Sequence, residues 1–325
     1  MVYALAGLSL IALLVIMIER KVYRIIIYTG IFSLMMAGIY LMLGSPDVAM
    51  AEAAIATYAT IFFIVVAERY YKKYRKRGED DATSATAYEK PKKGPSIAKV
   101  LLALLFTAGL GFLFVNFIPD INVNLDLRTL YLENFKVDVG GQNPIAAILM
   151  GYRLYDTLFE ALLLVIAIMA VSHLSFYDGV YVKEEKGDQS HVKRDKIAFY
   201  SIRIISPIII LFGIYLVANG HLSAGGGFQG GLAIAAFFVC RYMIHNIYDL
   251  PVKKVLKLEE IVFMALAIVA VIMVFVDTAS RVSEEYRFIF QSVHLYAANF
   301  LVGIKVACGF FILFYRFVAV ERLKE

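Results

Sequence analysis

The chain has 325 residues, of which 61% are hydrophobic and 18% are charged, and its formal net charge is +5. Soluble domains hold roughly 45–50% apolar residues, so this composition excludes an ordinary soluble protein and predicts one that lipid covers. The modest positive charge lies mainly in loops, which fits membrane orientation and not nucleic-acid binding. The two cysteines, Cys240 and Cys308, lie in apolar runs and indicate packing residues, not a disulfide or a metal site.

Apolar runs of about 20 residues, long enough to cross a bilayer, recur along the chain. They predict an all-α integral membrane protein with about nine transmembrane helices. The expected spans are residues 3–18, 24–43, 48–67, 97–118, 153–174, 198–218, 228–247, 257–276 and 292–317. Positive charges follow the first run instead of preceding it, so we expect a retained first span and not a cleaved signal peptide.

Basic residues gather in alternate loops and therefore predict the orientation of the spans. The loop 69–99 is the richest in Lys and Arg, which places it in the cytoplasm. Alternation then puts the N-terminus and the loop 119–143 outside and the C-terminus in the cytoplasm. The polar linkers 69–99 and 178–196 divide the chain into three pieces. These are residues 1–75, residues 76–177 (linker plus two helices) and residues 178–325 (linker plus four helices).

The third span carries two acids, Asp47 near its start and Glu52 about 7 Å further in. Ser45 and Pro46 suit a helix start, and Asp47 complements the positive end of the helix dipole, so a structural role is expected for Asp47. Alanines surround Glu52, which favours a position against another helix. Glu52 is a candidate for the proton or ion path, and an interhelical hydrogen bond is the alternative.

The fifth span follows Pro144, which can start a short interfacial helix. Asp156 and Glu160 are four residues apart and share one helix face, so their charges repel and favour an exchangeable proton. Glu160 is deeper and is the better candidate for a proton relay. Asp156 can instead pair with Arg153, three residues earlier.

Lys305 lies near the middle of the ninth span, too deep for its side chain to reach water. A charge at that depth costs at least about 2.5–3.5 kcal/mol, so Lys305 needs a carboxylate, a polar cavity or a neutral state. A buried lysine can release and accept protons, which makes Lys305 a relay candidate; a structural ion pair is the alternative. Gly303 and Ala307 form a small-xxx-small pair beside it and predict close packing against another helix.

The outer loop NGHLSAGGGFQGG is rich in glycine, but no Gly-Lys-Ser/Thr follows, which excludes a nucleotide-binding loop. Its glycines can let backbone groups line an ion path, let another subunit approach closely, or form a tight turn. His221 is a titratable group in this loop and a weaker candidate for the path. His294 and Asn299, on the outer half of the last span, are expected to be polar packing residues.

Four stretches of the sequence resemble three known types of small membrane subunit. GSPDVAMAEAAIATYATIFFIVV resembles the D-type unit that Mrp-type sodium/proton antiporters share with the archaeal membrane-bound hydrogenase. NPIAAILMGYRLYDTLFEALLLVIA resembles the E-type unit of that hydrogenase, whose pattern is Asp-Thr-Leu-Gly-Glu; Phe159 replaces the glycine, while Asp156 and Glu160 match. SPIIILFGIYLVANGHLSAGGGFQGG and NFLVGIKVACG resemble the Mrp B-type unit, which is the F-type unit of the hydrogenase. That family commonly has His-Asn-x-Pro-Gly-Gly-Gly-Phe in the loop, and Leu222 and Ala224 depart from it.

The resemblance implies that the acids matching Glu52 and Glu160 take part in ion translocation and that Lys305 corresponds to a lysine of the B-type last helix. It implies Na⁺, H⁺, Mrp C-like subunits and large antiporter-like subunits as partners. The expected protein is a non-catalytic, multi-pass subunit of a respiratory membrane complex, without a cofactor or metal. An archaeal sulfane sulfur reductase is the leading host, and a hydrogenase or an Mrp antiporter are the others. A scaffold that conducts no ions and a self-sufficient transporter remain alternatives.

Overall fold

The computed structural model describes residues 2–80, 105, 125–175, 196–244, 252–280 and 287–319. The regular structure in these ranges is entirely helical, which confirms the predicted all-α character of the fold. The chain divides into two compact units, residues 1–67 together with 134–325, and residues 68–133. The first of these two units holds every candidate residue named above.

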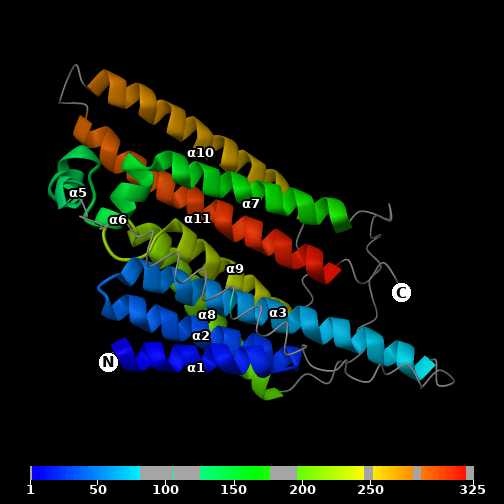
Figure 1. The fold of residues 1–325 in the computed structure, drawn as a ribbon. Coiled ribbons are helices and arrows are strands. Elements are labelled where there is room, and N and C mark those ends of the chain that lie inside the picture. Colours follow the sequence, from blue (N-terminus) through cyan, green and yellow to red (C-terminus); the bar gives the residue numbers. More distant parts are fainter. Residues whose placement is uncertain are drawn as a thin grey trace. The chain divides into compact units, whose positions relative to one another are not determined.

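Long helices follow the apolar runs of the sequence (Figure 1). Each of the predicted spans except 97–118 overlaps one of them, because an apolar run in lipid satisfies its backbone hydrogen bonds only as a helix. The helices are α1 Val2–Ile18, α2 Val22–Met42, α3 Pro46–Asp80, α5 Leu125–Asp138, α6 Pro144–Ala147, α7 Leu154–Ser175, α8 Lys196–Asn219, α9 Gly227–Ile244, α10 Val252–Ser280 and α11 Arg287–Ala319, with a π-helical turn, η1, at Ile148–Tyr152. The fourth predicted span, 97–118, lies almost wholly outside the described residues.

Helix α11 lies at the centre of the first unit, where it packs against α7, α8, α9 and α10. Figure 1 shows α11 running alongside α7 and α9. The buried face of α11 contributes Leu295, Ala298, Ile312 and Phe314 to the core. This explains why α11, which carries Lys305, is the most deeply buried of the apolar helices.

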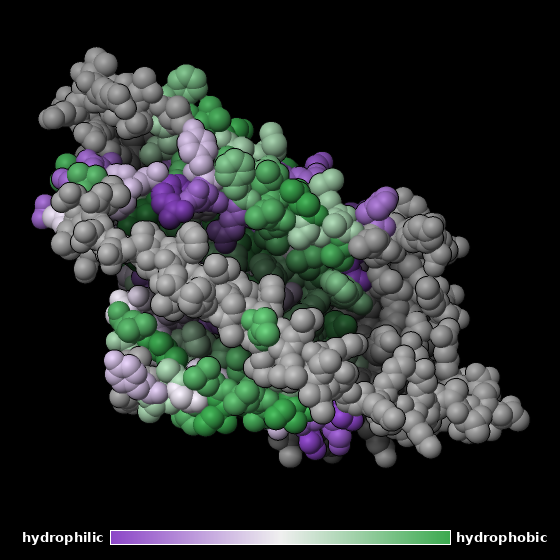
Figure 2. All heavy atoms as spheres, viewed as in Figure 1, coloured by the Kyte–Doolittle hydropathy of each residue, from purple (hydrophilic) through white to green (hydrophobic). Residues whose placement is uncertain are grey.

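Five described helical segments are long and apolar enough to cross a membrane. They are Val22–Met42, Pro46–Ala67, Leu154–His173, Phe199–Asn219 and Val293–Phe317, and the helices Tyr3–Ile18 and Gly227–Arg241 are shorter but also apolar. Figure 2 shows broad apolar surface over α7 and over α1 and α2. The apolar helices expose large apolar side chains such as Leu163, Met169 and Leu211. Exposure of so much apolar surface to water is unfavourable, so the protein is a multi-pass membrane protein whose helices lipid covers.

Helical structure also occurs in two segments that were predicted as loops. The apolar span Pro46–Ala67 agrees with the predicted span 48–67, but its helix continues to Asp80, so the first part of the predicted linker 69–99 is helical. Arg and Lys have good helix propensity, so a basic segment can extend a helix beyond its apolar part. The predicted outer loop 119–143 contains the helix Leu125–Asp138, whose mixed composition hid it from a hydropathy reading.

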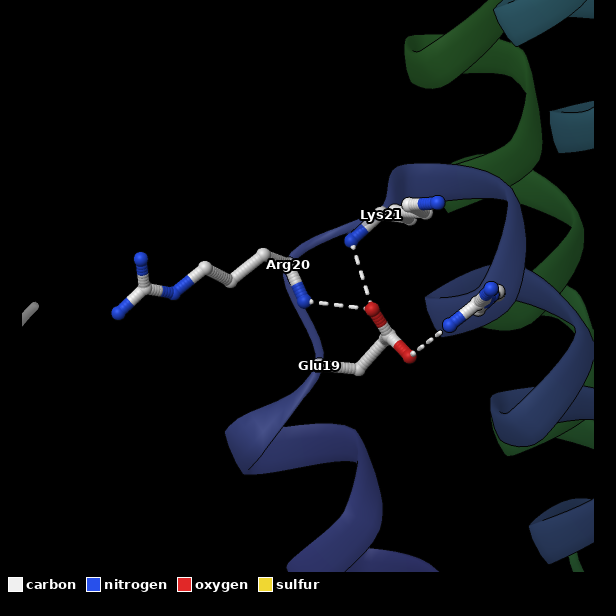
Figure 3. A network of polar contacts seen from close by, with 4 residues as sticks. Glu19, Arg20 and Lys21 are labelled. Atoms are coloured by element: carbon white, nitrogen blue, oxygen red, sulfur yellow. Dashed lines mark hydrogen bonds and ion pairs between the residues drawn. The ribbon is translucent and has the colours of Figure 1, made fainter. Parts of the chain in front are cut away.

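The turn between α1 and α2 is held by Glu19 (Figure 3). Its Oε1 accepts hydrogen bonds from the backbone N–H groups of Arg20 at 2.9 Å and Lys21 at 3.1 Å, and Arg24 Nη1 lies 3.3 Å from Oε2. Hydrogen bonds from the N–H group of Lys21 and then that of Arg20 lower the pKa of the Glu19 carboxyl from its ordinary value. Glu19 therefore stays ionised and neutralises part of this basic turn.

Candidate functional site

Lys305 on α11 forms an ion pair with Glu259 on α10. Lys305 is 0% exposed and Glu259 is 2% exposed, so the pair is enclosed by the protein. The Lys305 ammonium also lies 5.1 Å from the centre of the Phe263 ring, one turn after Glu259 on α10. The geometry supplies the carboxylate that the depth of Lys305 requires, and an aromatic face adds a cation–π contact.

Glu259 is one of two residues that sequence analysis missed. It lies at the beginning of the predicted span 257–276, where a carboxylate near the membrane surface needs no special explanation. In the structure α10 begins earlier, at Val252, and Glu259 is buried against α11. The available signal was the pairing of an acid and a lysine in two consecutive spans.

Helix α9 packs closely against α11 near Lys305. An ideal Cβ placed on Gly231 of α9 would come within 2.6 Å of the Gly303 carbonyl oxygen on α11. One placed on Gly227 would come within 2.2 Å of the Asn299 carbonyl oxygen. Only glycine fits where two backbones approach this closely, and the prediction of close helix packing at Gly303 is confirmed.

A second group of polar residues lies where α3, α6 and the loop before α9 meet; we call it the outer polar junction, after the side of the membrane on which the sequence predicts it. It consists of Asp47, Asn143, Asn299 and the loop residues 220–227. Asp47 Oδ1 accepts from Asn143 Nδ2 and from the backbone N–H of Gly225, both at 3.0 Å. The Asp47 carbonyl oxygen also accepts from Gln229 Nε2 at 3.5 Å. Asp47 is 8% exposed, so its polar atoms are satisfied by protein groups.

Asn143 lies at the centre of this junction. Sequence analysis also missed this residue. Three oxygens lie within hydrogen-bond distance of its Nδ2 and share its two N–H donors: Asp47 Oδ1, the Ser223 carbonyl oxygen at 2.9 Å and the Gly220 carbonyl oxygen at 3.1 Å. Its Oδ1 accepts from the N–H groups of Ile145 and Ala146 and so caps α6. The Asn-Pro dipeptide at 143–144 was the available signal, because Asn is a preferred N-cap and Pro a preferred first helical residue.

The predicted polar packing residues on α11 have specific partners. Asn299 Oδ1 accepts from the Gly227 N–H and its Nδ2 donates to the Val217 carbonyl oxygen, both at 2.6 Å, which joins α8, α9 and α11. His294 Nε2 donates to the Met150 carbonyl oxygen in η1 at 2.9 Å. His221 packs its ring edge-on to Tyr296 at 5.5 Å. The His221 carbonyl oxygen accepts from the N–H groups of residues 142 and 143.

Glu52 and Glu160 lie in different environments from the Lys305 pair. Glu52 accepts a hydrogen bond from the Ser33 hydroxyl, which links α3 to α2. Glu160 is exposed on α7. Asp156, on the same face, accepts from Arg153 Nε at 2.5 Å, so the structure forms the alternative pair that the sequence allowed. Among the described residues no cluster of three or more His, Cys, Asp or Glu side chains has the geometry to hold a metal ion.

Two family models match the chain. Residues 197–321 match a model described as "Domain related to MnhB subunit of Na+/H+ antiporter", and residues 7–72 match the MbhD model, which describes the D-type subunit of MBH. The first match spans α8 to α11 and includes Lys305 and Glu259. The second spans α1, α2 and most of α3 and includes Asp47 and Glu52.

Curated relatives match parts of the chain. An uncharacterised protein of Methanocaldococcus jannaschii is 32% identical over 134 residues, which cover 38% of this chain and 50% of that protein. A Staphylococcus haemolyticus protein assigned as antiporter subunit mnhA2 is 25% identical over 180 residues, which cover 55% of this chain and 20% of that protein. The chain thus spans about half of the first relative and a fifth of the second.

Two solved structures share the fold. The Mrp complex from Dietzia sp. DQ12-45-1b matches 96% of this chain and 34% of its own chain, with a TM-score of 0.61 and 18% identity. The membrane-bound sulfane sulfur reductase, an archaeal respiratory membrane complex, matches 67% of this chain and 97% of its own, with a TM-score of 0.52 and 24% identity. Residues 7–72 and 197–321 are thus similar to small membrane subunits of the Mrp antiporter type, and the chain shares its fold with the two solved complexes.

Proposed function

We propose that this protein is a non-catalytic subunit of a sodium/proton-translocating module within a respiratory membrane complex. The two family matches support the outer pieces of the predicted division, residues 1–75 and 178–325, and we assign residues 76–177 to an E-like piece between them. Its neighbours are Mrp C-like and large antiporter-like subunits. An archaeal sulfane sulfur reductase is the host that we favour, and the shared fold supports that choice.

The buried pair of Lys305 and Glu259 is the observation that carries this proposal. A buried ion pair adds little net stability compared with a well-packed apolar pair, so stability alone does not explain its presence. A lysine and a carboxylate in contact can exchange a proton between an ionised and a neutral state. We therefore place Lys305 and Glu259 on the proton or ion path.

The other predicted acids belong to the same proposal with weaker support. The hydroxyl of Ser33 on α2 donates a hydrogen bond to Glu52. Glu160 is exposed, so a neighbouring subunit or water can reach it. We assign both to the path, with Asp156 and His221 as secondary members. Asp47, His294 and Asn299 are assigned structural roles, because each is committed to fixed hydrogen bonds.

The nine-span topology is also part of the proposal. It places the N-terminus outside, the C-terminus in the cytoplasm and the outer polar junction on the outer side of the membrane. The alternation of basic loops supports this orientation.

The alternative function is a scaffold subunit that joins antiporter modules without conducting ions. The outer polar junction favours this alternative, since hydrogen bonds between buried polar groups join distant parts of the chain there. The two functions differ in what a charge-removing substitution does. At Glu52 and Glu160, such a substitution impairs assembly in a scaffold, whereas in an ion path it leaves an assembled complex that no longer couples. At the buried Lys305–Glu259 pair, where loss of one charge is itself destabilising, the charge-keeping Lys305→Arg makes the distinction.

Purification from the native membrane tests the proposed membership of a complex. An affinity-tagged full-length chain should co-purify with an Mrp C-like subunit and a large antiporter-like subunit, identified by mass spectrometry. Recovery of the chain alone, with sodium/proton exchange in reconstituted vesicles, would instead identify a self-sufficient transporter.

A further inference from the structure

We propose that the outer polar junction is an interaction surface by which the three membrane pieces of this chain hold one another without their covalent linkers. The pieces are residues 1–75, 76–177 and 178–325. This inference concerns assembly and is independent of the proposed ion path.

Each piece contributes to the junction. The first piece supplies the Asp47 carboxylate, the second supplies the Asn143 amide, and the third supplies the backbone of the loop 220–227. Asn143 and Asp47 are 96 residues apart, and Asp47 and Gly225 are 178 residues apart. These contacts are therefore not a consequence of neighbouring positions in the sequence.

The chemistry of Asn143 suits this position and few other side chains would. Its NH₂ group faces three oxygen acceptors from the first and third pieces, while its carbonyl oxygen caps α6 in its own piece. An aspartate would keep the cap but would lose both N–H donors and would repel Asp47. Asn143 is 4% exposed, so water does not replace a lost partner.

Polar contacts matter more than apolar area for joining helices in a membrane, because lipid covers apolar surface as well as protein does. Other links join the pieces in pairs. Tyr58 of the first piece donates to the Phe310 carbonyl oxygen of the third at 2.7 Å, and His294 links the third piece to Met150 of the second. The outer polar junction differs because it joins all three pieces at one place.

Cleavage of the assembled full-length chain tests this inference. Protease recognition sites are inserted at 84–88 and at 184–188, and the protein is cut in the membrane after it has assembled. The pieces are then extracted in mild detergent and recovered through a tag on the C-terminal piece. With the native junction, all three pieces should be recovered together.

Two substitutions and one control make the test specific. Asn143→Asp should lower recovery of the two untagged pieces about tenfold or more, since several buried partners lose their donors. Asp47→Ala should release the first piece selectively, because Asn143 keeps its bonds to the Gly220 and Ser223 carbonyl oxygens. Gln142→Ala is the matched control, because that side chain is exposed and its backbone N–H donor to the His221 carbonyl oxygen is retained.

Two results would overturn the inference. One is separation of the pieces with the native junction, which would show that the linkers hold them together. The other is recovery of all pieces at the control level from the cleaved Asn143→Asp or Asp47→Ala protein. If Asn143→Asp does not accumulate before cleavage, Asp47→Ala decides the question alone. Ion transport is not measured, so failure of the proposed function would not affect the result.

Discussion

Lys305 on α11 and Glu259 on the neighbouring helix α10 form an ion pair, and neither side chain has more than a few per cent of its surface exposed. Lys305 lies midway along the apolar segment Val293–Phe317, about 18 Å from either end. At that depth each charge is the main reason that the other is tolerated. This mutual dependence leads directly to a stability prediction.

Removing one member of the pair should cost more stability than removing both. Glu259→Gln leaves an uncompensated ammonium and should destabilise the protein by up to about 3–5 kcal/mol. The double variant Glu259→Gln/Lys305→Met should recover most of that loss, because no charge remains buried. Thermal loss of the helical circular dichroism signal in detergent measures the difference. Glu260→Gln, at an exposed neighbouring acid, is the control and should stay within about 0.5 kcal/mol of the native protein. Equal losses in single and double variants would show that the charges are not coupled.

Glu160→Gln should leave the complex assembled, because the amide keeps the size and the hydrogen-bonding capacity of the carboxyl while it removes the exchangeable charge. Sodium/proton transport in vesicles should fall. Asp156→Asn should have a milder effect, since Asp156 lies nearer the helix start and pairs with Arg153. Unchanged transport in Glu160→Gln, at normal complex abundance, would remove Glu160 from the ion path.

Gly231→Ala should destabilise the packing of α9 on α11 by about 1–3 kcal/mol, as overpacking of a tight contact does. The added Cβ would meet the Gly303 carbonyl oxygen at 2.6 Å, and neither backbone can move aside without shifting its helix. Gly7→Ala is the matched control, because nothing lies within 4 Å of the Cβ that it adds. The same thermal measurement in detergent applies. A Gly231→Ala protein as stable as the Gly7→Ala protein would contradict the close approach of the two helices.

Reporter fusions test the proposed topology. A reporter in the segment 85–95 and another at the C-terminus should both report the cytoplasm, and a reporter inserted in the segment 119–124 should report the outside. The reason is the alternation of basic and non-basic loops. A cytoplasmic signal from 119–124 would contradict the nine-span arrangement.

Hydropathy was sufficient to predict most of the helices, because lipid allows an apolar run of this length only a helical backbone. It could not predict α5, whose charged and apolar residues alternate without a long apolar run, nor the extension of α3 to Asp80. The depth of Lys305 predicted a partner but could not name it, since many pairs of helices could have been neighbours. Glu259 and Asn143 were missed because each lies near the end of an apolar run, where polar residues are common, and only the packed structure shows that they are buried.

Sodium/proton transport by the complex that carries Lys305→Arg is the most direct test of the proposed ion path. Arginine keeps a positive charge beside Glu259 but cannot release its proton at physiological pH. If Lys305 relays protons, the Lys305→Arg complex should assemble at native abundance and should lose coupled transport. Full transport by the assembled Lys305→Arg complex would contradict the relay and would leave the pair with Glu259 as a structural ion pair.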